Sequence, residues 1–189
     1  FLILSLLVGQ ELSNGLVIYT PFSSSNDYTT TYLTDHHFNI INSWQHDDQS
    51  IPASMPYLNQ DSTIWYPCQS DNPTMISGGV GGKIQKLDWH NNILWEYLIS
   101  NDSLQHHHDI EPMPNGNILV IAWSRKNLQE SQSMGRVLIE TPLQQIWSES
   151  IFEIKPIGLD SAEIVWEWHL WDHLVQNVDP DLPNYGAIS

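Results

Sequence analysis

One stretch decides the fold: residues 84–95 read Ile-Gln-Lys-Leu-Asp-Trp-His-Asn-Asn-Ile-Leu-Trp. An apolar segment leads into a polar turn, and a second apolar segment ends in tryptophan. Asp and Asn favour such turns because their side chains bond the nearby backbone and tolerate left-handed dihedral angles. The stretch therefore predicts a β-hairpin that ends in a tryptophan.

The same pattern occurs elsewhere in the chain. Residues 32–44 repeat it, and residues 151–156 with 164–168 form a looser third copy. A second kind of hairpin, with a four-residue turn before an apolar strand, is found at residues 58–65 and 113–120. Two hairpins make a four-stranded unit, and the units recur about every 50–70 residues. This repeat is typical of a β-propeller, in which one tryptophan of each blade packs between neighbouring sheets.

We therefore predict an all-β fold, a partial β-propeller of about three four-stranded blades. Residues 67–82 and 125–136 are expected to be loops. Three blades cannot close a ring, and an exposed blade face is unstable alone, so the chain is expected to be an N-terminal fragment. The expected strands are Leu16–Tyr19, Thr30–Thr34, Ile40–Trp44, Lys83–Asp88, Ile93–Ile99, Asp109–Met113, Ile118–Trp123, Val137–Glu140, Ile151–Ile154 and Ile164–Trp168.

The charge of the chain excludes one large class of partner. Its 189 residues hold 22 acidic and 6 basic side chains, for a formal net charge of −16. A polyanion such as DNA is repelled by this charge, so nucleic-acid binding is not expected. The single cysteine, Cys68, cannot form an internal disulfide and is expected to be a bystander thiol in a turn-like segment.

The first residues resemble an export signal. The segment Phe1–Gly9 is apolar but too short to span a bilayer, and it is similar to the core of a secretory signal peptide. We expect residues 1–14 to be a signal-peptide remnant and residues 15–189 to form the incomplete propeller domain. A secreted or periplasmic protein with no membrane attachment in its mature form follows. The alternative is that these residues form a buried first strand.

Three adjacent histidines, His106, His107 and His108, are the first candidate for chemistry. Imidazole can act as a base, a nucleophile or a metal ligand near neutral pH. Strand alternation predicts that His108 and Ile110 share one face and that His107 lies on the other, with Asp109 and Glu111. A solvated strand end or hydrogen-bonded structural histidines would also fit. A metal site is not expected, because adjacent histidines on a strand do not easily reach one ion.

The second candidate is the tryptophan-rich segment 166–174, in which His169 and His173 are four residues apart. Aromatic side chains with polar groups among them suit a planar phenyl ligand, so His169, Trp168 and Trp171 are predicted to bind substrate. A core tryptophan with a hydrogen-bonded histidine is the alternative. The glycine-rich segment 78–82 lacks the lysine and the strand-to-helix context of a phosphate loop, and it is expected to be a flexible entry into a blade.

These motifs together resemble the arylsulfotransferase family of exported propeller proteins. They occur in order from about Gly15 to the end of the chain. The resemblance is carried by Gly79–Gln85 with Asp88-Trp89, His107–Glu111 with Pro114–Asn117, Ala122-Trp123, Val165–His169, Trp171–Leu174 and Asn184–Gly186.

The family resemblance implies a six-bladed propeller with a site in its central channel. It also implies transfer of a sulfuryl group from a phenolic sulfate ester to a phenol through a sulfohistidine, without a cofactor. By position, His108 is the expected channel histidine, and His108 and His107 are the predicted catalytic residues, with His108 in contact with the sulfuryl group or the leaving oxygen. The nucleophilic histidine and the arginine of the family are expected in later blades. The expected partners are small aromatic sulfate esters and phenols. A catalytically silent propeller that binds a ligand or protein, and a hydrolase of sulfate esters, remain alternatives.

Overall fold

A computed structural model describes residues 15–21, 29–47, 50–136 and 144–187. Within them the chain is all-β, as predicted, with one short helix, α1 (Leu128–Ser133), and a 3₁₀ turn, η1 (Leu170–His173). The expected signal-peptide remnant and the expected strand Val137–Glu140 lie outside the described residues. The strands are β1 (Val17–Tyr19), β2 (Thr30–Thr34), β3 (Ile40–Gln45), β4 (Tyr57–Leu58), β5 (Ile64–Gln69), β6 (Gly82–Leu87), β7 (Ile93–Leu98), β8 (Leu104–Pro112), β9 (Ile118–Asn127), β10 (Gln145–Ile157) and β11 (Ser161–His169).

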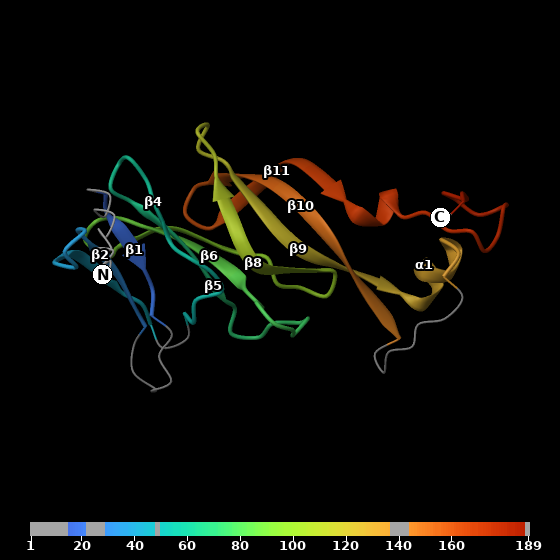
Figure 1. The fold of residues 1–189 in the computed structure, drawn as a ribbon, viewed down its shortest axis with the longest axis horizontal. Coiled ribbons are helices and arrows are strands. Elements are labelled where there is room, and N and C mark those ends of the chain that lie inside the picture. Colours follow the sequence, from blue (N-terminus) through green and yellow to red (C-terminus); the bar gives the residue numbers. More distant parts are fainter. Residues whose placement is uncertain (1–14, 22–28, 48–49, 137–143, 188–189) are drawn as a thin grey trace, which may run out of the picture.

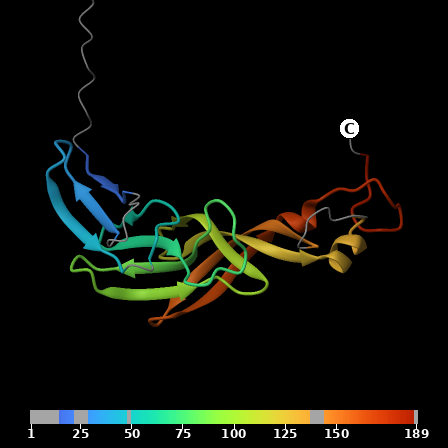
Figure 2. The ribbon, with the colours of Figure 1, turned by 90° about the horizontal axis from the view of Figure 1, so that it is seen from below.

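The strands form three antiparallel sheets in which each strand pairs with the next along the chain. The first sheet is β1-β2-β3, the middle sheet β4-β5-β6-β7 and the third sheet β8-β9-β10-β11. The sheets follow one another along the long axis of the molecule (Figures 1 and 2). Among the described strands, no pairing closes the sheets into a barrel.

The predicted Asp/Asn turn occurs twice, at Asp88 and at Asp35, with the same hydrogen bonds. The Asp88 carboxylate accepts hydrogen bonds from the backbone N–H groups of His90 and Asn92 and from the Asn92 side chain, all at 2.8 Å. Asp35 makes the same three contacts with His37 and Asn39. These bonds, chiefly those from the asparagine, hold the pKa of each aspartate below its ordinary value.

A β-bulge also recurs at one place in each sheet. The register shifts between Leu33 and Thr34, between Lys86 and Leu87, and between Glu153 and Ile154, so that the last strand carries one extra residue each time. A bulge bends its strand and increases the local twist. Each of the three sheets therefore ends in a bulged strand.

Tryptophans seal the contacts between successive sheets, as predicted. Trp44 packs with Ile64 and Tyr66 between the first and middle sheets, and Trp95 packs with Ile118 between the middle and third sheets. Both indoles are buried. Each also donates a hydrogen bond to a carbonyl in the last hairpin of the following sheet: Trp44 Nε1 to that of Asp88, in the turn, at 2.7 Å, and Trp95 Nε1 to that of Ser161, the first residue of β11, at 2.8 Å.

Both predicted loops are shorter than expected. β5 extends to Gln69, and Cys68 lies buried in this strand rather than in a turn; burial raises the pKa of its thiol to about 12. β9 extends to Asn127, and α1 follows at once. A capping box starts α1, because the Asn127 side chain accepts from the N–H of Glu130 while the Glu130 carboxylate accepts from the N–H of Asn127.

Candidate functional site

The three histidines lie on β8, an edge strand of the third sheet. The pairing of β8 with β9 is irregular between His106 and Ile110, and His108 has a positive φ of 53°. The predicted alternation is therefore wrong: Ile110 is buried in the core, whereas His108 is exposed. Because of this irregularity, the His108 side chain is exposed while the side chain of Ile110 packs in the core.

The glycine-rich segment does more than lead into β6, because it also packs against these histidines. The N–H of His108 donates to the carbonyl of Gly79 at 2.6 Å, and Val80 bridges to His107. A Cβ on Gly79 would lie 2.3 Å from His108 Nε2, and the φ of Gly79 is +73°. Only glycine fits there, because its backbone must approach the imidazole closely in a left-handed conformation.

His107 and His108 form a hydrogen-bonded relay with Glu149 of β10. His107 Nε2 lies 2.7 Å from Glu149 Oε2, and His107 Nδ1 lies 2.8 Å from His108 Nδ1. A carboxylate can only accept, so His107 carries its proton on Nε2 and leaves Nδ1 as an acceptor. The proton between the two Nδ1 atoms must then belong to His108. In the neutral relay, His108 Nε2 is therefore an unprotonated nitrogen with an available lone pair.

The relay is held in place by aromatic packing. His107 is buried and stacks on Trp123 with ring centroids 4.2 Å apart and planes at 15°. Trp123 Nε1 donates to the second oxygen of Glu149 at 3.2 Å, which orients the carboxylate. Burial lowers the pKa of His107, and the Glu149 carboxylate acts in the opposite direction. The site thus keeps His107 neutral while offering it a partner for a proton.

His106 belongs to the core and not to this relay. Its ring is fully buried, and Nδ1 accepts from the N–H of Gly82 at 3.0 Å. Burial lowers its pKa to about 3, with the neighbouring His107 as the second cause. His106 is therefore a neutral structural histidine, which was one of the alternatives left open by the sequence.

The structure does not bring His169 to the relay. His169 Nδ1 lies 2.8 Å from Ser150 Oγ, whereas the preceding residue, Glu149, contacts His107. Successive residues of a strand point to opposite faces, so His169 and the relay lie on opposite faces of the third sheet. Trp168 lies on β11, which is the edge strand opposite β8 in the third sheet. Its ring stacks on that of His173, in η1, with ring centroids 5.1 Å apart.

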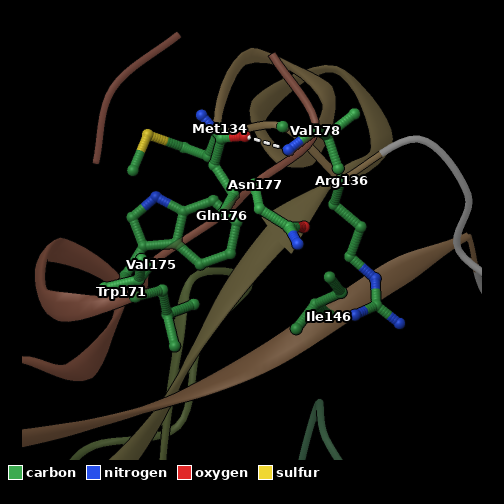
Figure 3. A pocket seen from close by; sticks show the side chains of 10 residues that line it. Met134, Arg136, Ile146, Trp171, Val175, Gln176, Asn177 and Val178 are labelled. Atoms are coloured by element: carbon green, nitrogen blue, oxygen red, sulfur yellow. Dashed lines mark hydrogen bonds between the residues drawn. The ribbon is translucent and has the colours of Figure 1, made fainter. Parts of the chain in front are cut away.

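Trp171 lines a separate pocket of about 490 Å³ near the C-terminal end of the described chain. Figure 3 shows Trp171 and Arg136 on opposite sides of this pocket, with Asn177 between them. Lys126 lies over the Trp171 ring, 5.6 Å from its centroid. The predicted substrate-binding residues are thus divided between different places in the fold.

The described residues contain no group of three or more His, Cys, Asp or Glu side chains that could hold a metal ion. In the same part of the chain, no helix is long and apolar enough to cross a membrane. No protein-family model, curated protein sequence or solved structure matches the chain significantly.

Sequence reasoning missed Glu149. Its contact with His107 joins residues that are 42 positions apart, and it depends on the register of β8, β9 and β10. The alternation of Trp147 and Glu149 along one strand predicts a shared face, but nothing in the sequence indicates which strand that face meets.

Proposed function

We propose that this protein is an exported, arylsulfotransferase-like enzyme on a β-propeller scaffold, and that His108 accepts the sulfuryl group. Support for the propeller comes from the three successive meander sheets with the same bulge, and from the buried tryptophans of the first and middle sheets, each of which donates to a carbonyl in the last hairpin of the following sheet. Support for the chemistry comes from the sequence motifs and from one observation above all: the relay leaves His108 Nε2 with a free lone pair on an exposed ring.

The reaction follows from this protonation pattern. His108 Nε2 attacks the sulfur of an aryl sulfate, the bond from sulfur to the aryl oxygen breaks, and a phenolate leaves. The Nδ1 proton of His108 passes to Nδ1 of His107, so the positive charge comes to rest beside the Glu149 carboxylate. This transfer offsets the acidity that sulfonation gives to the imidazole ring.

The second half regenerates the histidine. An acceptor phenol attacks sulfur as it loses its proton, which the departed phenolate or solvent takes up. The bond from sulfur to Nε2 breaks, its electron pair returns to nitrogen, and the proton on His107 returns to His108. A water molecule in place of the phenol gives hydrolysis of the sulfate ester by the same steps.

The experiment uses the full chain with a chromogenic aryl sulfate, with and without added phenol. We expect phenol-dependent release of the chromophore, and His108→Ala to lower kcat by at least about 10³-fold. His90→Ala is the matched control, because His90 is an exposed histidine in a turn of the middle sheet. Full activity in His108→Ala would exclude this histidine as the nucleophile.

A catalytically silent ligand-binding protein is the second candidate. The observation that favours it is the pocket around Trp171, which contains neither His107 nor His108. This alternative predicts that wild-type protein binds a phenyl sulfate without turning it over, and that Trp171→Ala weakens binding while His108→Ala does not. Calorimetric titration of these variants separates the two functions.

A further inference from the structure

His108 holds a backbone conformation that residues other than glycine rarely adopt. Its φ of +53° lies in the left-handed region, where the Cβ atom crowds the backbone. A residue stays in this region only when the structure around it fixes it there, and such residues cluster at functional sites. The contacts that fix the backbone of His108 therefore also decide where its imidazole lies.

Two of these contacts hold the N–H group and the ring of His108. The N–H donates to the carbonyl of Gly79 at 2.6 Å, and the ring is bonded to His107 at 2.8 Å. The peptide that follows His108 needs a separate restraint, because β8 pairs with β9 at His106 and then again only at Ile110. Residue 109 is therefore the place where the second half of the conformation is fixed.

The Asp109 carboxylate supplies this restraint. Its Oδ1 accepts three hydrogen bonds, from Ser54 Oγ at 3.0 Å, from the Tyr57 hydroxyl at 2.8 Å and from the N–H of Ile110 at 2.9 Å. Ser54 precedes β4, the edge strand of the middle sheet, and Tyr57 begins it. Burial and the bond to Asp109 raise the pKa of Tyr57, so its hydroxyl stays protonated and donates. Bonds to a carboxylate are stronger than bonds between neutral groups, and these two tie the strained part of β8 to the middle sheet.

We propose that Ser54 and Tyr57 are positioning residues for His108, which they hold in its left-handed conformation through the Asp109 carboxylate. The catalytic consequence rests on the proposed function, because the position of the imidazole affects the rate only if His108 attacks sulfur. Among the described residues, neither hydroxyl forms a hydrogen bond to the relay itself. Removing them should therefore displace the nucleophile without removing a relay group, and a displacement of about 1 Å can cost on the order of 10²-fold in rate.

The test combines kinetics with ¹⁵N NMR of the histidines in the full chain. We expect Tyr57→Phe and Ser54→Ala together to lower kcat for an aryl sulfate by about 10²-fold, with KM near that of the wild type. The His108 signal should move from the Nδ1–H tautomer toward the tautomer mixture of a free histidine, because its bond to His107 is no longer held. Tyr57→Phe alone, which keeps the ring, should give a smaller change of the same kind. Tyr97→Phe is the matched control, since it removes a hydroxyl of the middle sheet that bonds to no other described residue.

Substitutions of Asp109 separate position from charge. Asp109→Asn keeps an oxygen that can accept from both hydroxyls, so it should keep most of the wild-type His108 signal, whereas Asp109→Ala should lose it. Two outcomes overturn the proposal. One is a double variant of Ser54 and Tyr57 that keeps the wild-type His108 signal, and the other is Asp109→Asn protein that loses the signal as fully as Asp109→Ala protein does.

The NMR measurement does not require turnover, so it separates this proposal from the proposed function. A wild type that is inactive towards aryl sulfates would defeat the proposed function, and the His108 signal would still decide whether Ser54 and Tyr57 position this ring. A changed signal with an unchanged kcat would support the positioning role and count against His108 as the nucleophile.

Discussion

At the scale of single residues, the site depends on which nitrogen holds each proton. The Glu149 carboxylate requires a proton on His107 Nε2, and this places the proton of His108 on Nδ1. We expect ¹⁵N NMR near neutral pH to show His107 as the Nε2–H tautomer and His108 as the Nδ1–H tautomer. An Nε2–H signal from His108 would contradict the proposed lone pair.

Glu149 is a positioning residue whose charge and geometry can be separated. Glu149→Gln keeps the size of the side chain but removes the charge that faces His107. We expect kcat to fall by about 10²-fold and the His107 tautomer signal to broaden or change, while the melting temperature stays near that of the wild type. A loss of activity with an unchanged NMR signature of His107 would contradict this role.

Gly79 can be tested against its neighbour. In Gly79→Ala, the new Cβ meets the His108 ring and the backbone is strained at φ +73°, so the free energy of unfolding should fall by about 1–2 kcal/mol. Gly78→Ala is the control, since a Cβ there meets nothing within 4 Å. Urea denaturation of both variants measures the difference, and equal stability would contradict the packing described here.

At the scale of structural elements, Trp95 and Trp166 both lie next to the bulge of their sheet, but they should differ greatly in their contribution to the free energy of unfolding. Trp95→Ala removes a buried side chain and its bond to Ser161, at a cost of about 3–5 kcal/mol. Trp166→Ala removes a side chain that is 48% exposed, and in dilute protein we expect a loss of less than about 1 kcal/mol. Urea denaturation at low protein concentration compares the two variants. Similar losses of stability would mean that the Trp166 side chain is buried in solution.

The elements were largely predictable from sequence, and the relay was not. Alternation and Asp/Asn turns located the hairpins because these signals are local. The irregularity within residues 106–110 and the register that brings Glu149 to His107 arise from pairing between distant strands, which local patterns do not encode. The helix α1 did have a local signal, the Asn127 to Glu130 capping box, and it was overlooked within a segment expected to be a loop.

At the scale of the whole molecule, buried histidines should make the fold sensitive to acid. Burial lowers the pKa of His106 to about 3 and that of His46 to about 4. The unfolded chain binds these protons near pH 6.5, so it holds more protons than the folded chain below that pH. Stability is therefore full above about pH 6.5 and falls with acid until the folded pKa values are reached, by up to about 1.4 kcal/mol per pH unit for each histidine.

Urea denaturation at pH 7.5 and at pH 5 measures this loss. His106→Gln keeps an acceptor for the N–H of Gly82 but cannot be protonated, so the difference between the two pH values should shrink. His90→Gln, at an exposed position, should leave the difference unchanged. An undiminished difference in His106→Gln would mean that His106 does not contribute to the acid sensitivity.

The tryptophan bonds between sheets also set an order of assembly during synthesis. Trp44 and Trp95 find their acceptors 44 and 66 residues further along the chain. At about 5–20 residues per second, a ribosome needs several seconds to add that length. The first and middle sheets therefore leave the exit tunnel before the acceptor of their tryptophan has been synthesised, so for several seconds the nascent chain exposes an unpaired indole to chaperones.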